Sequence, residues 1–132
     1  MILSRNQLNG SIPVELGTLS TLSYLDLDNN ELAGNIPPEL GQLSSLITLK
    51  LGNNQLTGNI PAELGNLTNL ISLHLRQNEL EGNIPGQLGD LNNLQYFYIN
   101  DNQLSGCYDD NLSIFCSQLY SVFNTNSNVI PF

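Results

Sequence analysis

The stretch LSSLITLKLGNNQLTGNIPAELGN, residues 43–66, decides the fold because its pattern recurs every 24 residues. Asn54 in this stretch has counterparts at Asn6, Asn30, Asn78 and Asn102, and the leucines, glycines and Ile-Pro pairs around it keep the same phase. Such a fixed period is typical of repeat proteins, in which each unit packs mainly against its neighbours. We therefore predict a solenoid over residues 1–114, with a partial unit at 1–18, full units at 19–42, 43–66, 67–90 and 91–114, and a degenerate C-terminal capping unit at 115–132.

Each position in the repeat predicts a local structure. Residues 24–28, YLDLD, alternate apolar and polar as a strand with one buried face does. Strands that recur once per turn must lie parallel, about 4.8 Å apart, so we expect five strands in one concave sheet. The proline of each Ile-Pro pair fixes φ and favours a short 3-10 or α turn on the convex side. The predicted fold is an α/β repeat solenoid, a right-handed coil with a concave parallel sheet and short 3-10 turns on its convex side.

Asparagine and glycine complete the predicted turn. The asparagine after each strand should be buried, and its amide should serve its own turn and the next. This structural ladder comprises Asn6, Asn30, Asn54, Asn78 and Asn102. A glycine follows the last leucine of each convex turn, where we expect a residue with positive φ. These glycines are Gly17, Gly41, Gly65 and Gly89.

The charge and hydropathy of the chain exclude several classes of function. Twelve acidic and three basic residues among 132 give a formal charge of −9. Binding to nucleic acid or to an anionic membrane needs a Lys/Arg patch, which this sequence lacks. No apolar run approaches the roughly 18 to 20 residues that span a bilayer, and no secretory signal precedes the first repeat. We expect neither nucleic-acid binding nor membrane insertion for this segment.

The pattern LxxLxxLxLxxNxLxGxIPxxLGx, followed from about residue 3 to residue 106, resembles the plant-type leucine-rich repeats. That family includes ectodomains of plant receptor-like kinases, polygalacturonase-inhibiting proteins, and secreted bacterial and algal proteins. The resemblance implies a fragment of a secreted or receptor-like protein, located outside the cell or at its surface. It also implies a non-catalytic recognition module that binds a protein or peptide on its concave or lateral face. The chain lacks the paired-cysteine N-terminal cap of the plant ectodomains.

Residues at the outward positions of the concave strands are the candidates for ligand contact. They vary from turn to turn and include tyrosine and arginine, which are enriched at recognition surfaces. The candidate set is Tyr24, Asp26, Asp28, Lys50, His74, Arg76, Tyr96, Tyr98 and Asn100. Exposed strand positions also vary when no function constrains them, and tyrosine has a high strand propensity whether or not it binds a ligand. Tyrosine faces with polar neighbours suit sugars as well, so a cell-wall polysaccharide is the alternative ligand.

No catalytic, cofactor or metal site is predicted. His74 should lie two strands from Asp26 and Asp28, roughly 10 Å away, which is too far for a base and its orienting acid. We expect the two aspartates to be solvated surface acids, because two carboxylates on one strand make a poor calcium site. No serine or cysteine lies in a nucleophile-elbow motif, and the glycines follow the repeat rather than a phosphate loop.

The two ends of the coil differ from its inner turns in sequence. Cys107 and Cys116 could close a disulfide loop that contributes roughly 2.5 kcal/mol to stability, or both could stay reduced. A zinc site is not expected, because two cysteines alone supply too few ligands. At the N-terminus, the apolar residues of the first turn are covered on one side only, which predicts fraying or self-association there. At the other end, apolar residues can fold over the last turn: Phe115, Phe123, Ile130 and Phe132.

Overall fold

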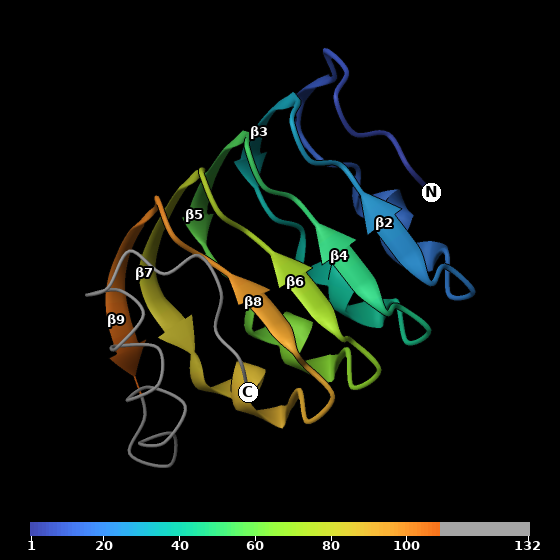
Figure 1. The fold of residues 1–132 in the computed structure, drawn as a ribbon, viewed down its shortest axis with the longest axis vertical. Helices are drawn as coiled ribbons and strands as arrows, with labels where there is room; N and C mark the ends of the chain where they lie inside the picture. Colours follow the sequence, from blue (N-terminus) through green and yellow to red (C-terminus); the bar gives the residue numbers. More distant parts are fainter. Residues whose placement is uncertain (109–132) are drawn as a thin grey trace.

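Residues 1–108 are described by a computed structural model, in which successive turns of the chain stack side by side (Figure 1). The concave sheet contains β2 (Tyr24–Asp26), β4 (Thr48–Lys50), β6 (Ser72–His74) and β8 (Tyr96–Tyr98). These strands are parallel and pair in that order, with each residue opposite its counterpart 24 positions on, as Leu25 is opposite Leu49. The expected fifth strand is reduced to one bridge between Ile2 and Asp26, although the N–H groups of Leu3 and Arg5 donate to the carbonyls of Asp26 and Asp28.

A second parallel sheet, which we did not expect from the sequence, follows the concave sheet in each turn. It contains β1 (Asn9–Gly10), β3 (Glu31–Asn35), β5 (Gln55–Asn59), β7 (Glu79–Pro85) and β9 (Gln103–Tyr108), in that order. Segments such as QLTGN are poor in strand-forming residues, and Gly58 has a φ of 73°. Hydrogen bonds from the neighbouring turns, rather than intrinsic propensity, therefore hold these residues in strands.

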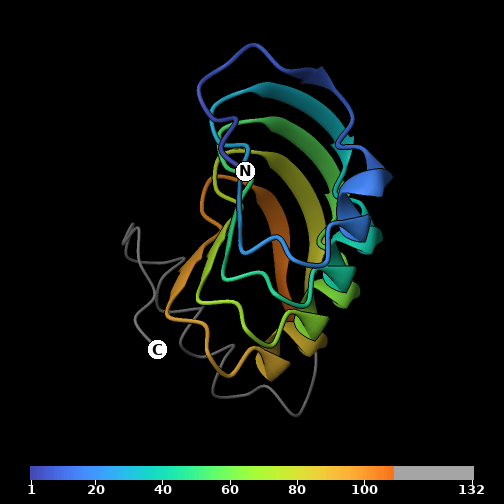
Figure 2. The same ribbon diagram turned by 90° about the vertical axis from the view of Figure 1, so that its right-hand side faces the viewer.

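The convex side carries short 3-10 helices, as expected (Figure 2). They are η1 (Val14–Thr18), η2 (Pro38–Gln42), η3 (Ala62–Asn66) and η4 (Gly86–Asp90). A proline with φ between −63° and −66° precedes each helix. Its ring fixes the φ with which the chain enters the turn.

The role that we expected for the convex glycines was wrong. Gly17, Gly41, Gly65 and Gly89 are not among the residues with positive φ. A Cβ on Gly17, Gly41 or Gly65 would instead collide with a backbone carbonyl oxygen of the next turn, which belongs to Glu39 in the case of Gly17. Glycine is therefore required at these three positions so that adjacent 3-10 helices can approach each other closely.

Leucine and isoleucine side chains form one core along the coil, and the asparagine ladder lies at the corner between the two sheets. Asn54 Nδ2 donates to the carbonyls of Leu51 (3.1 Å) and Leu27 (3.0 Å), and its Oδ1 accepts from the N–H of Leu32 (3.1 Å). Each amide thus joins its own turn to the preceding one, and not to the next as expected.

The burial expected for the ladder was correct for only one of its inner members. Asn78 is 8% exposed, whereas Asn30, Asn54 and Asn102 are half-buried and Asn6 is exposed. The half-buried members lie at the corner between the sheets rather than inside the leucine core, so one edge of each amide meets solvent. The expected capping unit lies outside the described residues, as does Cys116, so the disulfide with Cys107 stays a prediction.

Candidate binding surface

Polar side chains cover the outer face of the concave sheet, while alternate residues such as Leu49 and Leu73 point into the core. Tyr96 is the most exposed candidate at 45%. The other candidates except the two aspartates are half-buried: Tyr24, Lys50, His74, Arg76, Tyr98 and Asn100. Four adjacent turns therefore bring these side chains together on one surface.

Asp26 and Asp28 are not the solvated acids that we expected. They are only 8% and 9% exposed, because longer side chains of the same face close over them. Lys50 Nζ lies 3.9 Å from Asp26 Oδ2, and the Tyr24 hydroxyl donates to the same oxygen at 3.4 Å. Asp26 Oδ1 accepts the backbone N–H of Asp28 at 3.1 Å. Asp26 is thus held inside the surface and is not free to contact a ligand.

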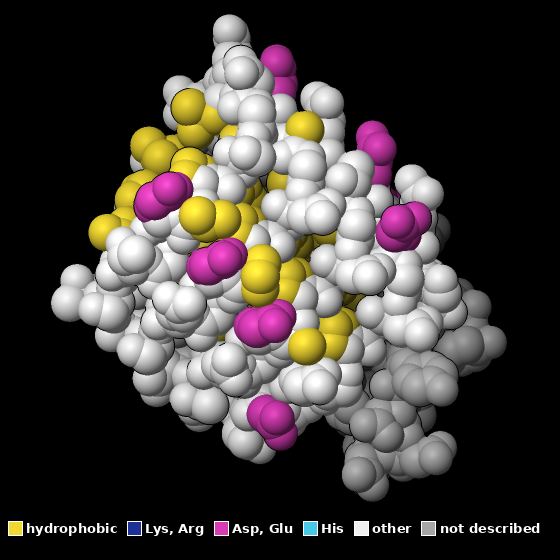
Figure 3. Space-filling model, turned by 180° about the vertical axis from the view of Figure 1, so that it is seen from behind, with side chains coloured by type: hydrophobic (Ala, Val, Ile, Leu, Met, Phe, Trp, Pro, Cys, Tyr) yellow, Lys and Arg dark blue, Asp and Glu magenta, His cyan; other side chains and the backbone are white. Residues whose placement is uncertain are grey.

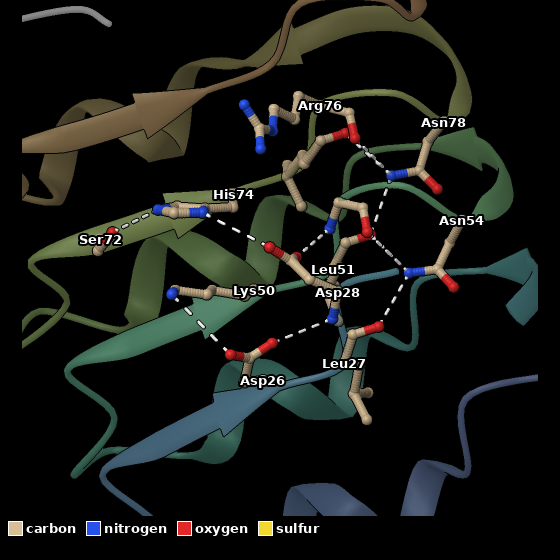
Figure 4. Close-up of polar contacts among 12 residues, drawn as sticks. Asp26, Leu27, Asp28, Lys50, Leu51, Asn54, Ser72, His74, Arg76 and Asn78 are labelled. Carbon is tan, nitrogen blue, oxygen red and sulfur yellow. Dashed lines mark hydrogen bonds and ion pairs between the residues drawn. The ribbon is translucent and has the colours of Figure 1, made fainter. Parts of the chain in front are cut away.

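The predicted separation of His74 from Asp28 was also wrong. His74 Nδ1 lies 3.8 Å from Asp28 Oδ2 (Figure 4). In the intervening turn of the coil, just after β4, lies Gly52, which has no side chain to keep them apart, and the N–H of Gly52 donates to Asp28 Oδ1 at 2.6 Å. On the other side of the ring, His74 Nε2 and Ser72 Oγ share a hydrogen bond of 2.9 Å, and the Tyr98 ring meets the imidazole edge-on at 4.4 Å.

Gly52 and Ser72 were not among the site residues predicted from the sequence, although the position of Gly52 in the repeat indicates a special role. Gly52 replaces a polar residue in the column of Asp28, Arg76 and Asn100, and a strand glycine often marks a close approach. Ser72 left no signal, because a serine on an exposed strand position is ordinary.

Arg76 differs from the other two basic side chains of this surface. Lys50 and His74 each face an aspartate, whereas no carboxylate of residues 1–108 pairs with the Arg76 guanidinium. Its Cζ lies 5.9 Å from the centre of the Tyr98 ring, and its Nε is buried without a hydrogen-bond partner in this part of the chain. Figure 4 shows the guanidinium directed away from both aspartates. Arg76 is therefore the cation that this surface leaves available.

The electrostatics of the two faces differ. The Tyr24 hydroxyl raises the pKa of Lys50 above its ordinary value, and Asp26 and Asp28 add to this shift although burial opposes it. The face seen from behind shows acidic side chains among apolar ones and no Lys, Arg or His (Figure 3). Glu15, Glu39 and Glu63 lie in the first turns of convex helices. The positive groups of the described residues thus gather on and beside the concave sheet.

Within residues 1–108, no three His, Cys, Asp or Glu side chains come close enough together to hold a metal ion. Over the same residues, no helix has the length and apolar character that crossing a membrane requires.

Comparison with known proteins gives the family. Residues 3–122 match the family model described as a leucine-rich repeat region, and no curated protein matches the sequence. Among solved structures, the ectodomain of the receptor kinase GASSHO1/SCHENGEN3 from Arabidopsis thaliana is 47% identical over 80% of this chain and 13% of its own, with a TM-score of 0.79. The plant peptide hormone receptor RGFR1 is 38% identical over 79% of this chain and 17% of its own, with a TM-score of 0.78.

A third structure, the BIR3–SERK2 complex from Arabidopsis thaliana, is 39% identical over 80% of this chain and 57% of the matched chain, with a TM-score of 0.77. The chain thus spans between 13% and 57% of these three matched chains. The repeat, the parallel sheets, the convex 3-10 helices and these matches agree, and the chain belongs to the plant-type leucine-rich-repeat family.

Proposed function

We propose that this solenoid is a non-catalytic recognition module that binds a protein or peptide partner across its concave sheet, outside the cell or at its surface. The contact residues in this proposal are Tyr24, Lys50, His74, Arg76, Tyr96, Tyr98 and Asn100. Asp26 and Asp28 act as positioning residues, because they hold Lys50 and His74 and are themselves nearly buried.

The unpaired guanidinium of Arg76 is the observation that carries this proposal. No carboxylate of residues 1–108 pairs with this charge. Because the Nε of Arg76 is itself buried, a carboxylate of a partner would bond to the terminal N–H groups of the guanidinium in a charge-assisted hydrogen bond. The Tyr98 ring beside Arg76 and the exposed Tyr96 supply the amphipathic contact area that recognition surfaces use. The proposed partner therefore presents an acidic group beside apolar side chains.

The solved relatives support a peptide or protein as the partner. The GASSHO1/SCHENGEN3 ectodomain is in complex with CASPARIAN STRIP INTEGRITY FACTOR 2, and RGFR1 is in complex with RGF2. Both are plant receptors, which supports an extracellular location for this chain as well.

A displayed peptide library selected on the immobilised chain tests the proposal. Selected peptides should be rich in Asp and Glu, and their affinities should be measured by calorimetry on the wild type and on variants. Arg76→Gln keeps a polar side chain but removes the charge, so it should weaken binding by about 1–3 kcal/mol, or roughly 5- to 150-fold.

The matched control is Glu63→Ala on the convex helix η3, which should change the affinity by less than about 0.5 kcal/mol. Tyr98→Ala should weaken binding as Arg76→Gln does, because Tyr98 supports the guanidinium. Equal losses from the concave and convex variants would place the site elsewhere.

A further inference from the structure

Figure 1 shows the loops through which the chain leaves each 3-10 helix and enters β4, β6 or β8. Side chains in and next to these loops line a second surface, which we call the lateral groove. Its volume is about 790 Å³, within the range of small-molecule sites. Three successive turns supply its principal lining residues: Ser45, Ile47, Asn69, Ile71, Asn93 and Gln95. None of the residues used in the proposed concave contact lines this groove.

The lining of the lateral groove is entirely uncharged in a chain whose net charge is −9. Asn69 Nδ2 donates to the Ser44 carbonyl at 2.9 Å, and Asn93 Nδ2 donates to the Thr68 carbonyl at 2.8 Å. Each bond fixes a carboxamide, while its Oδ1 and second N–H engage no other group within residues 1–108. The result is two oriented carboxamides, one from each of two successive turns.

Apolar side chains lie next to these two carboxamides. Ile47 is 43% exposed, Ile71 is half-buried, and both line the groove. The groove therefore offers apolar contact and amide groups along its wall.

Three backbone N–H groups of this flank are already paired from turn to turn, which favours a ligand that bonds to side chains. The N–H of Ile47 donates to the Ser23 carbonyl at 2.8 Å, that of Ile71 to Ile47 at 2.8 Å, and that of Gln95 to Ile71 at 2.9 Å. A bound peptide strand gains its affinity from free main-chain groups, and these three N–H groups are not free. Sugar hydroxyls both donate and accept, as do the side-chain amides that remain.

From this lining we propose that the lateral groove binds a neutral oligosaccharide. The carboxamides of Asn69 and Asn93 bond to sugar hydroxyls, and Ile47 and Ile71 contact the apolar faces of the sugar rings. An acidic oligosaccharide is excluded, because no cation lines the groove and the chain is itself strongly negative. The site is independent of the concave surface, so either proposal can fail without the other.

Calorimetry and amide NMR on the full 132-residue chain, made in a bacterial host without glycosylation, test this inference. The probes are cellohexaose, xylohexaose and mannohexaose, with hexagalacturonic acid as the charged comparison. At least one neutral probe should bind saturably, with the largest shifts at Asn69, Ile71 and Asn93. Hexagalacturonic acid should not bind.

The repeat itself supplies variants that keep the fold. Asn69→Ser installs the residue that the preceding turn carries as Ser45, and Asn93→Ser does the same one turn later. The double variant should bind the neutral probe at least about tenfold more weakly, which is 1.4 kcal/mol. Asn83→Ala, an exposed asparagine on β7, is the control and should bind as the wild type does.

Three results would each overturn the inference. The first is the failure of all three neutral probes to bind, and the second is unchanged binding by the double variant. The third is selection of uncharged peptides that depend on Asn69 and Asn93 when no sugar binds, which would make the groove a peptide site.

Discussion

Replacement of Asn78 by alanine tests the asparagine ladder at its most buried member. Asn78 Oδ1 accepts the N–H of Leu56 at 3.0 Å, and Nδ2 donates to the carbonyls of Leu51 and Leu75, both at 3.0 Å. Leu56 is fully buried, so water cannot replace the lost acceptor. The variant Asn78→Ala therefore leaves a buried N–H without a partner in the middle of the coil.

The expected loss of stability follows from these contacts. An orphaned buried N–H costs about 1–3 kcal/mol, and each of the two other hydrogen bonds contributes about 1 kcal/mol. The Leu51 carbonyl keeps a second donor from Asn54 at 3.1 Å, so no further orphan arises there. The sum is about 3–5 kcal/mol, which is a large part of the roughly 5–15 kcal/mol by which folded domains are stable.

Urea unfolding followed by circular dichroism and by tyrosine fluorescence measures the loss, since the chain has no tryptophan. The matched control is Asn6→Ala. Asn6 is exposed and donates to the carbonyls of Leu3 and Ser4. Water can bond to these carbonyls in Asn6→Ala, so this variant should lose less than about 1 kcal/mol of stability. Similar losses from Asn78→Ala and Asn6→Ala would refute the structural role of the ladder.

Three further predictions concern packing, pH and local stability. Gly41→Ala drives a Cβ onto the Glu63 carbonyl and should cost about 3 kcal/mol or more in thermal unfolding; an unchanged melting temperature contradicts this. The pKa of Lys50 is raised in the folded chain, chiefly by the Tyr24 hydroxyl. Its stabilising contribution is therefore complete below the ordinary lysine pKa of 10.5 and is lost as pH rises through the raised value. The stability difference between wild type and Lys50→Gln should therefore stay constant up to about pH 9.5 and shrink as the pH rises above the ordinary lysine pKa of 10.5; a difference that grows with pH over that range would contradict this. Ile2 is 70% exposed and Leu8 37%, so amides of residues 1–18 should exchange hydrogen faster than those of residues 43–90; uniform protection contradicts this.

The sequence predicts most of this fold because a strict period constrains packing more strongly than local propensity does. Leu25 and Leu49 keep the same phase, so their strands had to lie side by side. The second sheet could not be predicted this way, since segments such as QLTGN form strands only when neighbouring turns pair with them. The glycines of the convex turns illustrate the same limit. Their spacing is visible in the sequence, but the close approach at Gly41 appears only when two turns are stacked.

The sequence predicts which residues lie on the candidate surface, but not which of them contact each other. Strand alternation places His74, Arg76 and Tyr98 on the outer face. The predicted distance from His74 to Asp28 assumed that each side chain stands above its own strand. Gly52 leaves a gap that both side chains lean across, which reduces the separation to 3.8 Å. The lateral groove depends on the shape of three stacked turns, so no single segment of the sequence indicates it.

Amide chemical-shift mapping of the chain with a selected acidic peptide is the measurement that tests the proposed recognition surface most directly. We expect the largest shifts at His74, Arg76 and Tyr98, with little change in η1 to η4. We also expect that Arg76→Gln lowers the affinity and leaves the spectrum of the free protein unchanged away from residue 76. Shifts concentrated on the convex helices, or a pattern that is the same in Arg76→Gln, would contradict binding across the concave sheet.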